Sequence, residues 1–437
     1  MKICVQGLWH LGSVTAACLA ARGHEVSGLE EDAEVVAALA GGRAPISEPG
    51  LNELLREGLN ASRLYFSTDP ANALADCELL WVAFDTPVDE DDNADVDFVV
   101  ERVARALPHL PAGATVLVSS QLPVGSVARL EALAASSCPE KRLGFACSPE
   151  NLRLGKAIDV FLNPDRVILG LRPGTPHEAR LLQVFATIAD RVEVMGVESA
   201  EMTKHAINAF LALSVTFANE IATVCEATGA DAKEVERGLK TEQRIGPKAY
   251  LSPGAAFAGG TLARDIAFLS HAADKANLTL PLVRSVKVSN DDHKLWTRRT
   301  LAAHCPAFPR VRVAVWGLTY KPGTDTLRRS MAVELCRWLL DQGAEVTAHD
   351  PAAGELPLAL AGVRRVAAPL EALAGAQALV VCTQWPLYRN MAQQDVAAAA
   401  PGVVVVDADR FLCNLAAEGQ LTYRAVGTPK ARAGSCI

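Results

Sequence analysis

Two polar residues in one helical stretch, Lys204 and Asn208, have the types and the spacing for chemistry at a substrate oxygen. Residues four apart lie on the same face of a helix. An ammonium and a carboxamide that converge on one oxygen stabilise the negative charge of an alkoxide. Lys204 also has an interpretation without chemistry, because a lone lysine on a helix usually belongs to a solvated face. A third polar residue, Asp265, follows a Gly-Gly pair. Its structural interpretation is a carboxylate at a helix N-terminus, where the helix dipole favours a negative charge.

A second group of residues, Gly7–Gly12 with the sequence GLWHLG, lies between a predicted strand and a predicted helix. The dinucleotide-binding fingerprint G-x-G-x-x-G has this placement, with its first glycine in the turn and its third where the helix packs on the strand. Glu30 follows the second strand at the spacing of the acid that binds ribose hydroxyls. Its charge repels a 2′-phosphate, so it favours NAD over NADP.

Trp9 replaces the middle glycine of this fingerprint, where the backbone approaches a pyrophosphate. Two interpretations stay open: the indole points away and NAD still binds, or the domain no longer binds a dinucleotide well. Two later predicted strands end on the same carboxyl edge, in FDTP (Phe84–Pro87) and QLPVG (Gln121–Gly125). This edge is where α/β folds bind ligands. The predicted cofactor site consists of Gly7, Trp9, His10, Leu11, Gly12, Glu30, Thr86 and Gln121.

The elements that must position these residues alternate between strand and helix at both ends of the chain. KICVQG followed by SVTAACLAARG predicts a strand and a helix, and VRVAVWGLTY, AEVTAHDP and ALVVCTQWP resume the alternation. Between them we expect a long helix with Ser199 as N-cap and Gly229 as its stop, and a helical run over Arg264–Arg299. We predict an α/β protein with two Rossmann-like doubly wound parallel-sheet domains, residues 1–198 and 301–437, joined by a central helical region, residues 199–300.

The composition excludes several classes of protein. The chain has 437 residues and a formal net charge of -8, with no basic run, which argues against nucleic-acid binding. Its 11 cysteines are scattered and form no Cys/His cluster, so we expect no metal site and buried thiols in a reducing compartment. No uncharged apolar run approaches the about 20 residues of a membrane span. We therefore predict a cytoplasmic protein without membrane or nucleic-acid partners.

Five stretches together resemble the UDP-glucose/GDP-mannose dehydrogenase family, in order and over nearly the whole chain: Gly41–Leu55, Ser148–Gly170, Glu201–Ala222, Arg244–Asp265 and Val315–Ser330. The resemblance implies an NAD-binding Rossmann domain, a central helical dimerisation domain and a C-terminal α/β domain that completes a nucleotide-sugar site. It therefore implies a homodimer. The family oxidises a sugar C6 alcohol to a carboxylate with two NAD and no bound metal, through a thiohemiacetal and a thioester on a cysteine.

The resemblance also implies roles for single residues. Lys204 and Asn208 match an oxyanion and water-positioning pair, and Asp265 matches the aspartate that works with the lysine. Glu150 matches an active-site glutamate. The implied nucleotide-sugar contacts are Arg244, which in relatives reaches into the partner subunit's site, Tyr250, Phe257, Gly259, Lys321 and Arg328.

The chain departs from the family pattern at its most reactive position, since Thr261 stands where the catalytic cysteine is expected. A thiolate forms near neutral pH, whereas a hydroxyl needs a strong positioned base to act as a nucleophile. Further departures are Arg264 for a lysine, Gln121 for a threonine and Leu154 for a second glutamate.

Two functions fit these observations. The first is NAD-dependent oxidation of a nucleotide sugar at C6, with chemistry altered by Thr261: the product stops at the aldehyde or ketone, or a hydrated aldehyde is oxidised directly. The second is a non-catalytic nucleotide-sugar-binding paralogue with weakened NAD binding. We favour the first, with UDP-glucose or a related UDP-hexose as substrate, although Ala256, Phe257 and Leu262 look closer to the GDP-mannose branch.

Overall fold

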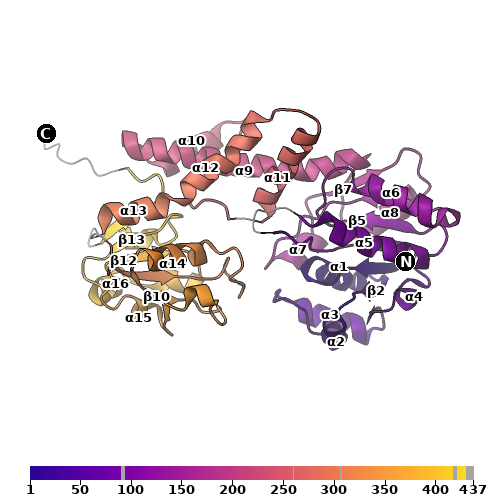
Figure 1. The fold of residues 1–437 in the computed structure, drawn as a ribbon, viewed down its shortest axis with the longest axis horizontal. Coiled ribbons are helices and arrows are strands. Elements are labelled where there is room, and N and C mark those ends of the chain that lie inside the picture. The colour runs from indigo at the N-terminus through magenta and orange to yellow at the C-terminus, as the bar shows by residue number, and fades with distance from the viewer. Residues whose placement is uncertain (90–93, 259, 306–307, 417–420, 430–437) are drawn as a thin grey trace. The chain divides into compact units, whose positions relative to one another are not determined.

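The computed structural model of the chain describes residues 1–89, 94–258, 260–305, 308–416 and 421–429. These residues form two compact units, Met1–Ile207 and Asn208–Ile437, each built around one β-sheet (Figure 1). The predicted α/β class with two Rossmann-like sheets and a helical centre is confirmed. The predicted boundaries of three domains stay a prediction.

The first unit contains an eight-stranded sheet with the order β3-β2-β1-β4-β5-β6-β7-β8. Its neighbours are parallel except for β6 and β7, which run antiparallel. The strand order reverses between β1 and β4, and ligands of such sheets bind outside the carboxyl ends at this point. The strands are β1 Lys2–Gln6, β2 Glu25–Leu29, β3 Leu64–Ser67, β4 Leu79–Val82, β5 Thr115–Val118, β6 Gly144–Cys147, β7 Val167–Leu171 and β8 Val192–Gly196.

Helices cover both faces of this sheet, so that its apolar strands are buried between two hydrophobic clusters (Figure 1). Aspartates begin several helices; for example, the Asp95 carboxylate accepts the N–H of Phe98 at 3.0 Å and caps α5. The helices are α1 His10–Ala21, α2 Ala33–Ala40, α3 Leu51–Asn60, α4 Pro70–Leu74, α5 Val96–Ala106, α6 Ser126–Ser137, α7 Ala157–Leu162 and α8 Glu178–Phe185, with 3-10 turns η1 Leu107–His109 and η2 Pro139–Lys141.

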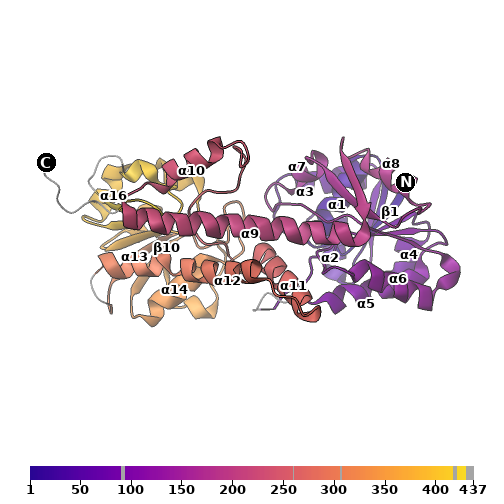
Figure 2. The ribbon, with the colours of Figure 1, turned by 90° about the horizontal axis from the view of Figure 1, so that it is seen from above.

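The central helices differ from the prediction in two places. Helix α9, Val197–Thr228, is the long central helix of Figure 2. It begins directly after β8, so Ser199 lies inside its first turn and is not the N-cap. Its end before Gly229, with φ +84°, is as predicted. The run expected over Arg264–Arg299 is divided, because Pro281 begins a new helix. The helices after α9 are α10 Ala232–Thr241, α11 Thr261–Lys275, α12 Pro281–Lys294 and α13 Trp296–His304.

The second unit contains a six-stranded, wholly parallel sheet with the order β11-β10-β9-β12-β13-β14. Its core divides into two apolar clusters, as in the first unit. The strands are β9 Arg312–Trp316, β10 Glu345–His349, β11 Arg364–Arg365, β12 Ala378–Val381, β13 Val404–Val406 and β14 Thr422–Arg424. The remaining helices are α14 Met331–Asp341, α15 Pro369–Ala372 and α16 Gln393–Ala399, with 3-10 turns η3 Leu358–Leu360, η4 Pro386–Asn390 and η5 Cys413–Ala416.

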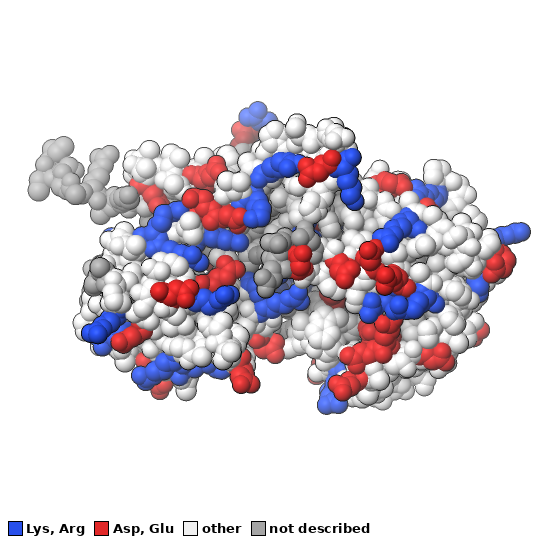
Figure 3. Space-filling view, in the orientation of Figure 1, with Lys and Arg blue, Asp and Glu red and all other residues white. Residues whose placement is uncertain are grey.

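The surface charges, one apolar helix and the cysteines relate to the predicted partners and the predicted cellular compartment. On the face drawn in Figure 3, lysines and arginines are interspersed with acidic side chains. Within the described part of the chain, α9 is the one helix long and apolar enough to cross a membrane, a criterion that core helices of soluble proteins also meet. The described cysteines are unpaired, and most are buried; Cys305 and Cys382 are partly buried and Cys413 is exposed.

Candidate functional site

The turn after β1 has the geometry of a dinucleotide loop. Gly7 adopts φ +87°, and a Cβ there would lie 2.5 Å from the ring of Phe84. A Cβ on Gly12 would lie 1.7 Å from the carbonyl oxygen of Gly7. Both positions therefore require glycine, the first for its backbone conformation and the second for the contact between α1 and β1.

Glu30 and Trp9 complete this loop. The Glu30 carboxylate, just after β2, accepts the N–H of Leu8 at 2.9 Å, which places the acid beside the loop where a ribose is bound in this fold. The Trp9 side chain is 49% exposed, and its backbone φ of -74° needs no glycine. The indole thus lies outside the packed turn, and the glycines and Glu30 fit a dinucleotide.

Asp85 is a charged residue of this loop that the sequence prediction missed. Its Oδ2 accepts the N–H of Leu11, in the first turn of α1, at 3.0 Å. Asp85 belongs to the FDTP stretch from which only Thr86 was selected. The buried Thr86 hydroxyl donates to the carbonyl of Gln121 at 3.0 Å, so the predicted loops after β4 and β5 do meet.

Glu48 is a second residue that the prediction missed. Its carboxylate is buried and accepts the N–H groups of Gly155 at 2.7 Å and Ala157 at 2.9 Å. It also lies 2.9 Å from Nε2 of His10. Glu48 thereby joins the dinucleotide loop to the segment that carries Glu150. Its position in the stretch Gly41–Leu55, which resembles the family, was the only indication in the sequence.

Lys204 lies in a small pocket of the first unit that Gln121 and Glu150 also line. Its ammonium donates to the carbonyl of Glu150 at 2.6 Å and lies 3.7 Å from that residue's Oε1. Only 9% of Lys204 is exposed, so it does not belong to a solvated helix face. The Glu150 carboxylate also accepts the N–H of Leu152 at 2.6 Å.

Glu201, one turn before Lys204, anchors the start of α9. Its buried carboxylate accepts the N–H groups of Gly125 at 2.7 Å and Val127 at 3.0 Å and so caps α6. Burial raises the pKa of Glu201, although these two hydrogen bonds oppose the rise. The adjacent His205 Nε2 lies 3.0 Å from the carbonyl of Leu122. These contacts fix the turn of α9 that presents Lys204.

In the second unit, Asn208 and Asp265 form a direct contact. The Asn208 amide donates to Oδ2 of Asp265 at 2.5 Å, and both residues are buried. Thr261, the exposed first residue of α11, precedes Asp265 by four residues and thus shares its helix face. The prediction that Asn208 and Asp265 have catalytic roles is not tested by this contact alone, but the two side chains are brought together.

Three predicted nucleotide-sugar residues lie in loops of the second unit: Arg244 and Tyr250 are exposed, and Phe257 is partly buried. Arg244 is paired with Glu242 at 2.9 Å, and its side chain is 88% exposed. Tyr250 is 58% exposed. The backbone N–H and carbonyl of Phe257 are held by the Asn290 side chain at 3.0 and 2.9 Å.

Of the other predicted nucleotide-sugar residues, two follow β9 and one is outside the residues that the structure describes. Lys321 is partly buried and Arg328 is exposed, and both lie in the turn between β9 and α14. Arg329, beside them, has φ +58°. Gly259 lies outside the described residues. The substrate-binding roles of all six residues stay predictions.

One thiol of the described part of the chain, that of Cys147, lines the pocket of Lys204, Gln121 and Glu150. Cys147, before Ser148, is 4% exposed, and burial raises the pKa of its thiol far above the usual range. Across the residues the structure describes, no group of three His, Cys, Asp or Glu side chains could hold a metal ion.

Comparison with known protein families finds matches to three successive parts of the chain. Residues 1–189 match the NAD binding domain of the UDP-glucose/GDP-mannose dehydrogenase family, residues 198–292 its central domain and residues 314–414 its UDP binding domain. The chain is 36% identical to the UDP-glucose 6-dehydrogenase of Pseudomonas aeruginosa over 452 aligned positions, which cover 100% of this chain and 99% of the relative. It is 33% identical to that of Rhizobium meliloti, over 90% of this chain and 91% of the relative.

A solved structure has the same fold over nearly its full length. The UDP-glucose dehydrogenase of Pyrobaculum islandicum superposes with a TM-score of 0.89 at 29% sequence identity. The superposition covers 98% of this chain and 97% of that one.

Proposed function

Because the chain belongs to the UDP-glucose/GDP-mannose dehydrogenase family, we propose that it oxidises the C6 alcohol of a UDP-hexose, UDP-glucose first, and releases the aldehyde. The predicted family, the predicted NAD cofactor and the prediction of an NAD-dependent nucleotide-sugar dehydrogenase are confirmed. The identity of the sugar and the number of oxidation steps are proposals. NAD, when bound, supplies the hydride acceptor.

The contact that carries this proposal is the hydrogen bond from Asn208 to Asp265. A carboxamide has two N–H donors, so Asn208 can donate one to Asp265 and the other to a substrate oxygen. Lys204 lies one turn earlier on α9 and brings a positive charge to the same helix face. Together the amide and the ammonium stabilise the negative charge that develops on O6 as the hydride leaves. Asp265 takes up the hydroxyl proton.

Thr261 limits the reaction to this first step. In the family, the second oxidation needs a cysteine sulfur that adds to the aldehyde. Thr261 offers only a hydroxyl, and Cys147 is buried with its thiol protonated at neutral pH. The alcohol would therefore lose one proton to Asp265 and one hydride, for which bound NAD would be the acceptor, and the aldehyde would dissociate.

The experiment incubates the protein with NAD and a panel of UDP- and GDP-sugars and measures NADH together with the product. We expect reduction with UDP-glucose, and an aldehyde that hydroxylamine converts to an oxime of the expected mass. Thr261→Ala should give the same product at a similar rate. A uronate formed with two NADH, unchanged in Thr261→Ala, refutes the single-step reaction. Reduction with GDP-mannose but with no UDP-sugar refutes the proposed substrate class.

We also propose a cytoplasmic homodimer of three-domain subunits, with bounds at residues 1–198, 199–300 and 301–437. The separate family matches to residues 1–189, 198–292 and 314–414 support these bounds. Apolar side chains seven residues apart on α9 support the dimer: Phe210, Phe217 and Val224 are 67%, 45% and 56% exposed. The interspersed charges and the unpaired, mostly buried cysteines support a reducing compartment without nucleic-acid or membrane partners.

A further inference from the structure

The N-terminus of α1 is capped by a carboxylate from another loop. The N-cap residue, Trp9, makes no side-chain hydrogen bond to the helix, and the first turn of α1 contains no acidic residue. Instead, Oδ2 of Asp85 accepts the N–H of Leu11 at 3.0 Å. A carboxylate at this place stabilises the helix end through a hydrogen bond and through the dipole.

The sheet holds Asp85 at this position. β1 and β4 pair in parallel, with Gln6 opposite Val82, and the N–H of Ala83 donates to the carbonyl of Gln6 at 2.8 Å. Phe84 then packs over Gly7, so closely that a Cβ on this glycine would clash with the ring. The next residue, Asp85, thus reaches the start of α1 from the neighbouring strand.

The same backbone donors are where a dinucleotide places its pyrophosphate. In a βαβ unit of this kind, the pyrophosphate binds the N–H groups at the N-terminus of the first helix. In this chain the Leu11 donor is held by a negative charge that belongs to the protein. Glu30 differs, because its position after β2 suits the ribose hydroxyls. A pyrophosphate carries two negative charges and is repelled by the Asp85 carboxylate at short range.

We propose that Asp85 sets the affinity of the chain for NAD by competing with the pyrophosphate for the N-terminus of α1. The cofactor binds only as the carboxylate gives up the Leu11 N–H. Binding is then weaker by the free energy of that displacement than in a chain with a neutral side chain at position 85. Ligands without phosphate do not experience this competition.

The test measures equilibrium binding by titration calorimetry, without any substrate turnover. The ligands are NAD, ADP-ribose and adenosine, which share the adenosine part, whereas only the first two carry a pyrophosphate. The variants are Asp85→Asn and Asp85→Ser, which keep a polar cap without the charge. Asp76→Asn is the matched control, because it removes one carboxylate that pairs with Lys2 at 2.7 Å, at the amino end of the strands.

We expect Asp85→Asn to lower the Kd for NAD and for ADP-ribose by about tenfold, since a nearby charge is removed from the anion site. The Kd for adenosine should stay within about twofold, and Asp76→Asn should change none of the three. Asp85→Ser should follow Asp85→Asn.

Two results overturn the proposal. One is unchanged or weaker binding of NAD and ADP-ribose in both folded variants, which would mean that Asp85 only stabilises α1. The other is an equal gain for adenosine, which would mean that the substitution reshapes the ribose site. Circular dichroism and the melting temperature establish that each variant is folded. If one variant does not fold, the other decides the question.

Discussion

At the scale of single residues, the proposed chemistry depends on side chains that backbone groups hold in place. The Lys204 ammonium donates to the carbonyl of Glu150, and the Glu201 carboxylate accepts two N–H groups at the start of α6. Both residues lie in consecutive turns of α9. The ammonium is therefore positioned before substrate arrives, as electrostatic stabilisation of an alkoxide requires.

Lys204→Met tests this role with a side chain of similar length and no charge. We expect kcat with the preferred sugar to fall by about 100-fold or more, because one stabilising donor is lost from the charged oxygen. The Kd for NAD, measured by calorimetry, should be unchanged. Lys287→Met, at a lysine that is 70% exposed, is the control and should keep wild-type kcat. A Lys204→Met enzyme with near-normal kcat would remove the lysine from the mechanism.

The residues that sequence patterns missed all act on partners far away in the chain. Asp85 bonds to Leu11, and Glu48 bonds to Gly155, which lies 107 residues further on. Strand and helix periodicity cannot identify such pairs, because they exist only once the strands are aligned in the sheet. Gly7, Gly12 and Glu30 were predictable because their spacing within one βαβ unit is itself the motif.

At the scale of elements, the two sheets repeat one local design. Gly7 after β1 and Gly317 after β9 have φ angles of +87° and +90°. Glu30 after β2 accepts the N–H of Leu8, and Asp350 after β10 accepts that of Leu318 at 2.7 Å. The first turns of the two sheets thus share a glycine at positive φ and an acid after the second strand.

The two loops differ in how many hydrogen bonds the acid after the second strand accepts. Asp350 also accepts the N–H and the hydroxyl of Thr319 at 2.9 and 3.0 Å and the Trp385 indole N–H at 3.1 Å. Burial raises the pKa of Asp350, but the backbone hydrogen bonds outweigh it, and the net pKa is lowered. The loop after β9 therefore uses its donors internally.

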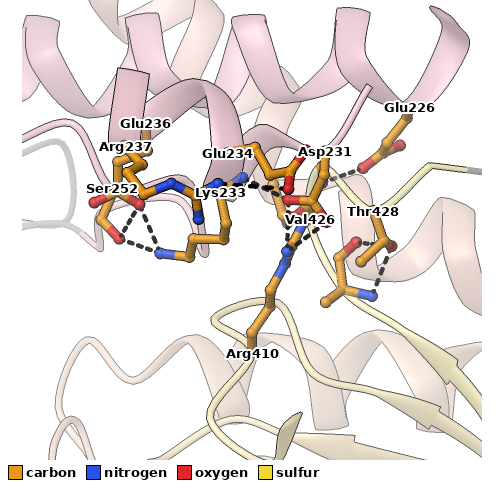
Figure 4. A network of polar contacts seen from close by, with 12 residues as sticks. Glu226, Asp231, Lys233, Glu234, Glu236, Arg237, Ser252, Arg410, Val426 and Thr428 are labelled. Carbon is orange, nitrogen blue, oxygen red and sulfur yellow. Dashed lines mark hydrogen bonds and ion pairs between the residues drawn. The ribbon is translucent and has the colours of Figure 1, made fainter. Parts of the chain in front are cut away.

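The start of α10 is connected to the second sheet through a polar network (Figure 4). The N-cap Asp231 accepts the Lys233 N–H at 2.7 Å, and its two oxygens lie 2.9 and 3.0 Å from Nη1 of Arg410. Burial raises the pKa of Asp231, but the hydrogen bonds from Arg410 and Lys233 outweigh it and leave the pKa below its usual value.

Asp231→Asn keeps the cap but removes the charge that Arg410 binds. At pH 7 we expect the melting temperature of the second unit to fall by about 2–4 °C, the effect of roughly 1 kcal/mol in a unit of this size. The folded pKa lies below the unfolded value of about 3.9, so this stabilisation is complete above that value and is lost as the pH falls through the folded pKa. The difference from wild type should therefore shrink below about pH 4.

Scanning calorimetry at a series of pH values measures this difference. Asp69→Asn is the control, because this N-cap aspartate accepts the Ala71 N–H in the other unit. Asp69→Asn should leave the melting temperature of the second unit unchanged. A difference between Asp231→Asn and wild type that stays constant down to pH 3.5 would contradict the assignment of the lowered pKa to Asp231.

Element boundaries were predictable where one residue type decides them. Gly229 ends α9 because it takes φ +84°. Ser199 was expected to begin the same helix, but β8 leads directly into it at Val197. Pro281 divides the helical run that apolar periodicity alone suggested was continuous.

At the scale of the whole molecule, the proposed homodimer depends on the apolar surface of the central helices. Several apolar side chains of the central helices are exposed: Phe210, Phe217 and Val224 on α9, and Leu282 and Val288 on α12. Exposed apolar side chains that repeat along one helix are typical of a protein interface. The proposed dimer would bury these side chains of α9, the one described helix that is long and apolar enough to cross a membrane.

Phe217→Asp should convert the proposed dimer to a monomer, because it places a charge among the exposed apolar side chains of α9. Light scattering after size exclusion measures the mass, which should fall from twice 46.3 kDa to a single copy. Leu358→Asp is the control, since this leucine is 91% exposed but belongs to η3, and it should remain dimeric. A wild-type protein that elutes as a monomer at all concentrations would refute the dimer.

The central claim, that Thr261 stops the reaction after one hydride transfer, is tested most directly by the ratio of NADH formed to UDP-glucose consumed in wild type and in Thr261→Cys. We predict one NADH and an aldehyde for wild type. For Thr261→Cys we predict a ratio that rises toward two, with a uronate as product, because a thiol can hold the aldehyde for the second oxidation. Wild-type protein that forms two NADH and a uronate from each UDP-glucose would contradict the account.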